Sequence, residues 1–285
     1  MPFHVFQIYY DETTRSSLDP GYLPLDNTRN DRPDWYELWV IRNFLRNHSL
    51  SENDWYGFLS PHFRHKTGLS AQDVYRFLEL SKDRSEVALL VAFAWDQVAY
   101  FLNPFDQGEI WHPGITALSQ SVLEQLGYNS RLSDLVTYSG NFTFCNYIVA
   151  KPAYWRAWLR LADGLFDLIE NQATALAKNL AGNTNYGWGW AFHHNKAPIK
   201  AFIQERLPAI ILAGRKFQTC TLNTSSTFPI YNVLFNVDHS TRGVLQTCDL
   251  LKQRFCETGD ARFLSLYKDI RQLVTLRLPN TTTPP

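Results

Sequence analysis

A basic segment that follows a short apolar run is the first candidate for a ligand site in this sequence. Residues 55–59 are aromatic and aliphatic, and the run is short enough to be a buried strand. Pro61 cannot donate a hydrogen bond to a strand ladder, so we expect the strand to end before it. The turn that follows is cationic, with Arg64, His65 and Lys66. Ligands of open α/β sheets bind outside the carboxyl ends of strands, so this turn is a candidate binding site. A solvated basic turn after a core strand is the alternative.

Asp96 and Glu109 are two candidate carboxylates, and each lies near the end of a predicted segment. Residues 87–93 form a nearly continuous apolar run, which is typical of a strand buried on both faces. Asp96 comes just after this run, where it is either a site residue or a strand-end cap. Glu109 ends a segment of turn-forming residues that begins at Asn103. His112 then stands at the start of a predicted helix, where it either contacts a ligand or only begins the helix.

A third carboxylate, Glu205, lies in a predicted helix over residues 200–212. Pro208 should break or kink that helix. Glu205 could act as a general base there. The alternative is a helix carboxylate paired with Lys200 or Arg206.

The elements that must position these residues alternate between strand and helix, which predicts an α/β domain with a mostly parallel sheet. The predicted strands cover residues 4–10, 55–59, 87–93, 132–139, 142–150, 217–222 and 229–234. The predicted helices cover residues 34–45, 71–80, 112–126, 153–180, 200–212, 241–255 and 261–276. Residues 11–33 read as a long loop rich in Pro, Asp and Asn. We expect a single domain over residues 1–278, with C-terminal helices in 235–278 and a disordered tail at 279–285.

Composition restricts the class of protein. Hydrophobic residues make up 45% of the 285 residues and charged residues 19%, which is enough apolar side chain for a large core. The 27 basic and 27 acidic residues cancel, so a broad nucleic-acid-binding surface is not expected. The four cysteines form no CxxC pair, and free thiols are the expected state. We see neither a signal peptide nor a membrane-spanning run, so we expect a soluble, cytoplasmic protein.

Several familiar catalytic motifs are missing from the sequence. It has no P-loop, no GxGxxG after the first strand, no GxSxG and no HExxH. It also has no Asp-x-Asp of the kind that many sugar-nucleotide enzymes use to hold a divalent metal. Asp163 and Asp167 stand one helical turn apart, and we expect a helix-surface pair there rather than a metal site. His193 and His194 are adjacent, which on regular structure points them in different directions.

Four segments in a fixed order carry a resemblance to a known family. They are the helix 34–43 with Glu37 and Arg42, the strand 55–58, the segment 144–151 with Asn146, and residues 201–207 with Glu205 and Arg206. Their order resembles that of bacterial glycosyltransferases of capsular polysaccharide and lipopolysaccharide assembly. The resemblance implies a GT-A-like, Rossmann-like fold with a mostly parallel sheet flanked by helices. It also implies transfer of a sugar from a nucleotide-sugar donor, a UDP- or GDP-sugar, to a glycan or lipid-linked acceptor.

That resemblance gives the candidate residues roles. The diphosphate needs cations, here Arg64, His65 and Lys66, or else Mn²⁺ or Mg²⁺. The base needs a flat floor, which Tyr9 or Tyr10 would supply. The acceptor hydroxyl needs a catalytic carboxylate, for which the candidates are Asp96, Glu109 and Glu205. The remaining binding candidates are Glu37, Arg42, His112, Asn146 and Arg206.

The same resemblance implies that the protein is located in the cytoplasm or at the inner face of the membrane, in contact with membrane-bound assembly machinery. Two other functions fit the residues. One is a non-catalytic glycan-binding or scaffold protein of polysaccharide assembly, which the many aromatic residues favour. The other is a different nucleotide-dependent transferase or hydrolase that uses the same site.

Overall fold

A mostly parallel sheet is the centre of the computed structural model, which describes residues 2–90, 95–171, 173–186, 195–214, 216–222 and 239–275. Six strands among these residues form the sheet in the order β2-β1-β3-β5-β4-β8. Their bounds are β1 Phe3–Tyr9, β2 Leu23–Asp26, β3 Trp55–Leu59, β4 Val87–Leu89, β5 Ile148–Ala150 and β8 Thr219–Thr221. β5 runs antiparallel to both of its neighbours, and the other pairings are parallel. The predicted α/β class and mostly parallel sheet are therefore confirmed.

The central strands β3, β4 and β5 are buried on both faces of the sheet because they are apolar on both sides. In β3 every residue is buried. Successive side chains of a strand point to opposite faces, so Tyr56 and Phe58 pack on one side while Trp55 and Leu59 pack on the other. Gly57 allows close packing in this strand, since a Cβ atom there would lie 2.7 Å from Cγ2 of Val149.

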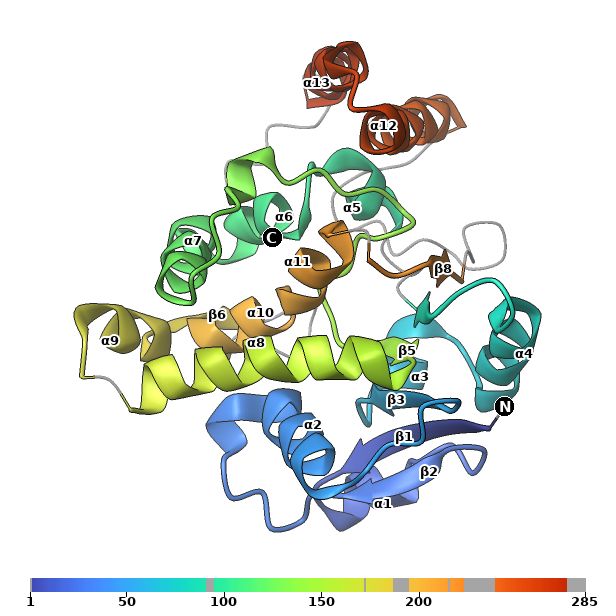
Figure 1. Ribbon diagram of the computed structural model, residues 1–285, viewed down its shortest axis with the longest axis vertical. Coiled ribbons are helices and arrows are strands. Elements are labelled where there is room, and N and C mark those ends of the chain that lie inside the picture. The colour runs from blue at the N-terminus through green and yellow to red at the C-terminus, as the bar shows by residue number, and fades with distance from the viewer. Residues whose placement is uncertain are drawn as a thin grey trace.

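Helices cover both faces of the sheet (Figure 1). Side chains from α2 (Tyr36–Asn47), α8 (Pro152–Glu170), α10 (Ile199–Gln204) and α11 (Leu207–Ala213) form the core on one face. Side chains from α3 (Phe63–Thr67) and α4 (Ala71–Ser81) form the core on the opposite face. The remaining elements are α1 (Glu12–Ser16), η1 (Pro33–Trp35), α7 (Ile115–Gln125), η3 (Leu132–Asp134), α9 (Ala175–Ala181) and the antiparallel pair β6 (Asn183–Tyr186) and β7 (Asn195–Pro198).

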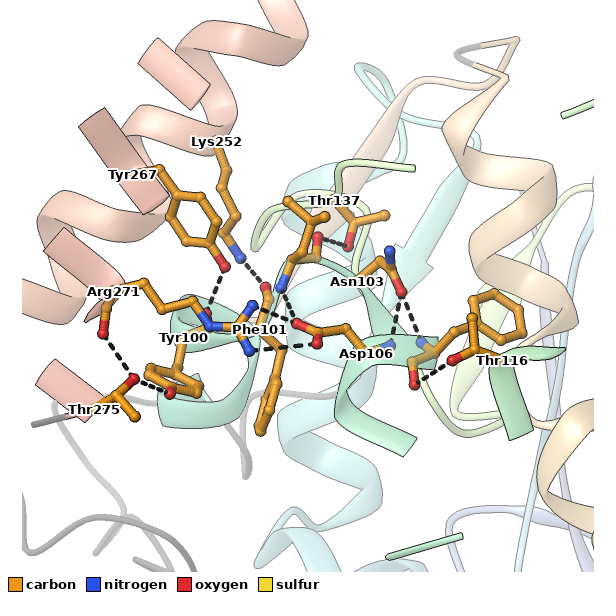
Figure 2. Close-up of polar contacts among 12 residues, drawn as sticks. Tyr100, Phe101, Asn103, Asp106, Thr116, Thr137, Lys252, Tyr267, Arg271 and Thr275 are labelled. Atoms are coloured by element: carbon orange, nitrogen blue, oxygen red, sulfur yellow. Dashed lines mark hydrogen bonds and ion pairs between the residues drawn. The ribbon is translucent and has the colours of Figure 1, made fainter. Parts of the chain in front are cut away.

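The C-terminal part is helical, as predicted, and lies at the end of the molecule opposite to β1 and β2 (Figure 1). It consists of α12 (His239–Thr258) and α13 (Ala261–Thr275), which pack against α5 (Trp95–Tyr100) and α6 (Pro104–Trp111). Figure 2 shows the polar contacts of this interface. Lys252 donates hydrogen bonds to the carbonyl oxygens of Val98 (2.5 Å) and Phe101 (2.7 Å). Arg271 pairs with Asp106 at 2.7 Å.

The strand predicted over residues 132–139 and the turn predicted at 103–109 are both wrong, and Asn103 explains both. Its side-chain oxygen accepts hydrogen bonds from the backbone N–H groups of Phe105 and Asp106, which caps α6 where we expected a turn. Its side-chain amide donates to the carbonyl oxygens of Leu132 and Leu135. Those carbonyls are therefore engaged outside any strand ladder, and the segment forms η3 and irregular structure. Of the strand predicted at 142–150, only β5 forms.

Three other predicted segments are divided or contain further elements. The helix predicted over 153–180 ends at Glu170, and α9 starts separately with Thr174 as its N-cap. The loop predicted over 11–33 contains α1, β2 and the start of η1. The helix predicted over 200–212 divides into α10 and α11, with Glu205 and Arg206 between them. Several predictions fall on residues outside the described ranges: the end of the 87–93 strand, the 229–234 strand, His193, His194 and the tail at 279–285.

No helix among the described residues is long and apolar enough to span a membrane.

Candidate functional site

One edge of the sheet gathers the ends of several strands. β5 is antiparallel to β3 and β4, so its first residues lie at the edge where β3 and β4 finish. Ser60, just after β3, shares a 2.8 Å hydrogen bond with the hydroxyl of Tyr147, just before β5. The backbone N–H of Leu90, just after β4, donates to the carbonyl of Tyr147. β1 also finishes at this edge, because it is parallel to β3. The crevice outside such strand ends is where open α/β sheets bind ligands.

Four side chains from four separate elements come together here. They are Glu37 in the first turn of α2, Lys66 in α3, Asn146 before β5, and Glu205 between α10 and α11. We call them the Glu–Lys cluster. Lys66 acts electrostatically on both glutamates, and Glu37 acts on Glu205. All four were sequence candidates, and the fold brings them together.

Glu205 has the electrostatic properties of a general base. Burial raises its pKa to about 7; the charge of Lys66 opposes this shift, and the charge of Glu37 adds to it. A carboxyl group that titrates near neutral pH can take up a proton and release it again under ordinary conditions. The residue as a whole is half-buried.

Glu37 and Lys66 complete the charges of the cluster. Burial raises the pKa of Glu37, and Lys66 and Asn146 limit that increase. Burial acts to lower the pKa of Lys66, but Tyr147, Glu37 and Glu205 outweigh it, so the pKa is raised and the ammonium stays charged. No ion pair within 4.0 Å joins Lys66 to either glutamate in the described part of the chain. Lys66 is exposed and Glu37 is half-buried.

Asn146 is buried near Glu37, and its side-chain amide makes no hydrogen bond to any described residue. Its side chain is 1% exposed, and neither amide atom has a hydrogen-bond partner among the described residues. It lies near enough to lower the pKa of Glu37, yet the pair does not meet hydrogen-bond geometry, so we treat it as a close approach. An unpaired buried amide costs about 1–3 kcal/mol.

Cys145 is the neighbour of Asn146 in the chain and lies near the cluster. Burial raises the pKa of its thiol to about 12. The thiol is therefore neutral at physiological pH, which does not suit a nucleophile.

The basic turn predicted after β3 is a short helix, α3, which ends at Gly68 with a φ of 73°. His62, its N-cap, connects the cluster to the end of β1. Burial lowers the pKa of His62, Lys66 and His65 lower it further, and Asp11 opposes them. Arg64 and His65 are exposed on the same helix.

The two tyrosines at the end of β1 differ in accessibility. Tyr9 is mostly covered, and the nearby Asp26 raises its pKa. Tyr10 is 39% exposed. Only Tyr10 of this pair offers a free ring face of any size to a ligand.

Arg206 supports Glu205 from the protein side. Its guanidinium donates to the carbonyl oxygens of Pro104 (2.8 Å) and Phe202 (2.8 Å) and to Oε1 of Gln107 (2.7 Å). These bonds hold the break between α10 and α11 against α6. Arg206 is therefore engaged by the fold, and a ligand role would require it to change partners.

Glu109 and Arg42 also have protein partners. The Glu109 carboxylate accepts from the backbone N–H groups of Gly114 (2.8 Å) and Thr116 (2.7 Å), at the start of α7. Arg42 donates to Asp163 at 2.5 Å and lies over the ring of Phe166. These contacts fit structural roles.

Asp96 and His112 are both buried. Asp96 is 0% exposed in the first turn of α5, and neither oxygen is hydrogen-bonded in the described part of the chain. Burial raises its pKa to about 7, and no member of the Glu–Lys cluster contributes to that shift. The His112 ring stacks on Phe202 at a centroid distance of 3.6 Å.

Tyr36 is the neighbour of Glu37 that sequence reasoning missed. It has a φ of 47° and a ψ of −133°, a backbone conformation that glycine normally adopts. No local signal in the sequence reveals this, because tyrosine is not a turn residue.

The described residues contain no group of three His, Cys, Asp or Glu side chains that could hold a metal ion, so we assign no step to Mn²⁺ or Mg²⁺. A comparison of the chain with protein families, curated proteins and solved structures found no match.

Proposed function

We propose that this protein is a glycosyltransferase that moves a sugar from a nucleotide-sugar donor to a growing polysaccharide or lipopolysaccharide glycan. One observation carries the proposal. Glu37, Lys66 and Glu205 come from distant parts of the chain and meet at the carboxyl edge of an α/β sheet. The sheet, with one antiparallel strand among parallel ones, is compatible with a GT-A-like fold.

The donor would lie along the sheet edge. Tyr10, with its exposed ring, is the floor for the base. Arg64 and Lys66, both exposed on α3, provide positive charge for the diphosphate. The sugar then lies beside Glu205.

The reaction is a single displacement at the anomeric carbon. The acceptor oxygen forms a bond to that carbon while the bond to the diphosphate oxygen breaks. Glu205, as carboxylate, takes the proton of the acceptor hydroxyl. Lys66 stabilises the negative charge that develops on the leaving nucleoside diphosphate. The expected acceptor is a glycan or lipid-linked glycan, and we propose that the protein works in the cytoplasm, at the inner face of the membrane.

A thermal-shift screen tests the proposal. The purified protein is heated with UDP, GDP and their hexose conjugates, with and without Mn²⁺ or Mg²⁺. A ligand that binds only the folded state raises its stability by an amount set by its concentration over Kd. A shift with one nucleoside diphosphate that the Lys66→Met variant loses supports the donor site. The absence of any shift under both metal conditions would contradict it and favour the non-catalytic glycan-binding function.

A further inference from the structure

The two C-terminal helices, α12 and α13, form a hairpin with a small core of its own, and we call it the C-terminal hairpin. Cys248 and Leu251 of α12 pack with Tyr267 of α13 in one small cluster. Leu245 and Val274 pack on α5 in another. None of these side chains belongs to the two clusters that cover the sheet. The apolar contacts of the hairpin therefore lie outside the core of the sheet.

The short helix α5 receives hydrogen bonds from the C-terminal hairpin at its C-terminal end. The last carbonyl groups of a helix have no partner inside that helix. Lys252 donates to the carbonyl oxygens of Val98 and Phe101. The Tyr267 hydroxyl donates to that of Tyr100 at 2.6 Å. Figure 2 shows both side chains reaching from the hairpin to this end of α5. A helix of 6 residues is not stable alone, so α5 should lose its structure when the hairpin leaves.

The opposite end of α5 buries a carboxyl group. Asp96 lies in the first turn, is 0% exposed, and has no hydrogen-bond partner for either oxygen in the described part of the chain. Burial raises its pKa to about 7, and no charged side chain of the described residues contributes to that shift. Because an unpaired carboxylate is costly to bury, the closed hairpin favours the neutral acid.

Lys252 is a buried group of the opposite charge. It is 0% exposed, and no carboxylate of the described residues lies within 4.0 Å of its ammonium group. Burial lowers its pKa to about 8; Asp249, Cys248 and Asp106 oppose this shift, and Arg271 adds to it. The closed hairpin therefore favours the neutral amine.

The other ionisable groups around Lys252 come from α12, α13 and α6. Arg271 of α13 is paired with Asp106 of α6 at 2.7 Å. Burial raises the pKa of Cys248 to about 11 and also raises that of Tyr267, whose ring centroid lies 5.6 Å from the lysine Nζ. Cys248 and Tyr267 are therefore neutral at the pH values at which Lys252 titrates.

We propose that α5 and the C-terminal hairpin open together as one unit, and that the buried groups Asp96 and Lys252 make this opening most frequent at neutral pH. The hairpin supplies the partners of the α5 carbonyl groups, so the two elements should separate from the sheet as a pair. Opening transfers both ionisable groups into water, where each charged form is solvated. The inference goes beyond the transferase proposal and does not depend on it.

The two groups affect closure with opposite sign. Closing raises the pKa of Asp96 from 3.8 to about 7, so its contribution to closure is full below pH 3.8 and is lost as the pH rises to about 7. Closing lowers the pKa of Lys252 from 10.5 to about 8, so its contribution is full above pH 10.5 and is lost as the pH falls to about 8. Closure should therefore be weakest between about pH 7 and about pH 8.

Hydrogen exchange of the full chain, measured by mass spectrometry from about pH 5 to about pH 10, tests the inference. Exposure times are scaled to the intrinsic exchange rate at each pH, so that the protection factor reports opening alone. Peptides from α5, α12 and α13 are compared with β3, which reports opening of the sheet. Asp96→Asn and Lys252→Met remove the two groups. Asp269→Asn and Arg254→Met remove exposed charges from the same hairpin and are the controls.

We expect α5, α12 and α13 to share a protection factor that is lower than that of β3. It should be smallest between about pH 7 and about pH 8 and rise by up to about tenfold per pH unit on either side. Asp96→Asn should lose only the rise on the acidic side, and Lys252→Met only the rise on the alkaline side, whatever their protection at neutral pH. The two control variants should keep both.

Three results would overturn the inference. One is equal protection of α5, the hairpin and β3 at every pH, because these elements would then open only with the whole domain. Another is a wild-type protection factor that is flat or changes in one direction across the pH range. The third is a profile with both rises in Asp96→Asn and in Lys252→Met. The wild-type profile decides the first two even if a variant fails to fold. Nucleotide binding, measured separately by thermal shift, tests the transferase proposal.

Discussion

Pro208 sets the position of Glu205. A proline clashes with the carbonyl oxygen four residues before it and cannot donate a helical hydrogen bond, and the residue four before Pro208 is Gln204, where α10 ends. Glu205 therefore stands between two helices, partly accessible, instead of on the side of one continuous helix. The break turns a helix carboxylate into a member of the Glu–Lys cluster.

The pH dependence of transfer should have an acidic limb set by Glu205. A general base must be deprotonated, and the pKa of Glu205 is about 7. Under limiting donor and acceptor, the rate should be half-maximal near pH 7 and fall about tenfold per unit below it. Glu205 should titrate between about pH 5 and about pH 8. A transfer rate that does not change over this range would contradict the assignment of Glu205 as the general base.

Neutralising the neighbours of Glu205 should shift that limb in opposite directions. Glu37 raises the pKa of Glu205 and Lys66 lowers it. Glu37→Gln should therefore move the acidic limb to lower pH, and Lys66→Met should move it to higher pH. Lys66→Arg keeps the charge and serves as the control, with its limb near that of the wild type. Shifts of the same sign in both neutralising variants would show that the three charges are not coupled as the structure has them.

The same group should make stability depend on pH. Folding raises the pKa of Glu205 from the ordinary 4.5 to about 7, so the folded state binds more protons between these values. The unfolding free energy contributed by Glu205 is then highest below pH 4.5 and declines as pH rises to about 7. Relative to the wild type, Glu205→Gln should gain stability over that window. Urea titrations at several pH values measure the difference, and a constant difference would argue against the raised pKa.

The charged network of Arg32, Asp34, Glu170 and Lys200 should matter for stability more than an exposed ion pair does. Lys200 is almost fully buried and pairs with Asp34 and Glu170. Lys200→Met should lower the free energy of unfolding by about 1–3 kcal/mol. The loss should be no larger because Arg32 still donates hydrogen bonds to Asp34 and Glu170. The control is Arg156→Met, which breaks an exposed pair with Glu52 and should cost less than about 1 kcal/mol. Equal losses of unfolding free energy in chemical denaturation would mean that the pairs of Lys200 contribute no more than an exposed ion pair does.

Lys252 should hold the C-terminal helices in place. It is fully buried and donates to the carbonyl oxygens of Val98 and Phe101 near the end of α5. Figure 2 shows Lys252 beside Phe101. Lys252→Met leaves those carbonyls without this donor, so amide exchange in α12 and α13 should accelerate more than exchange in β1 and β3. Arg254→Met, in an exposed pair with Glu257, is the matched control on α12. Uniform acceleration across the protein would indicate global destabilisation instead.

The sequence predicts the sheet better than the connections between its strands. β1, β3 and β8 and the C-terminal helices follow from apolar patterns, which report burial directly. The failure at residues 132–139 has a nonlocal cause, since the side chain of Asn103 takes the carbonyls that a strand would use. β2 was hidden because its residues are mostly exposed at the sheet edge.

The site residues, too, can be predicted from the sequence only in part. Strand ends and the position of Pro208 predict that Lys66 and Glu205 lie near breaks in regular structure. Which candidates meet depends on the antiparallel insertion of β5, which no local pattern encodes. Arg206 and Glu109 carry suitable chemistry, yet they bind backbone groups of the protein. The strained backbone of Tyr36 depends on charges from α8 and α10 and has no local signature.

The central claim is that Glu205 is the base of the transfer reaction, and the most direct test is the turnover of Glu205→Gln at saturating donor. Removing a general base typically costs about 10²–10⁴-fold in rate. We expect a loss of that size in kcat, with donor affinity unchanged and the fold intact by thermal melting. Turnover within about threefold of the wild type would contradict the account, because an effect that small is below what a general base contributes.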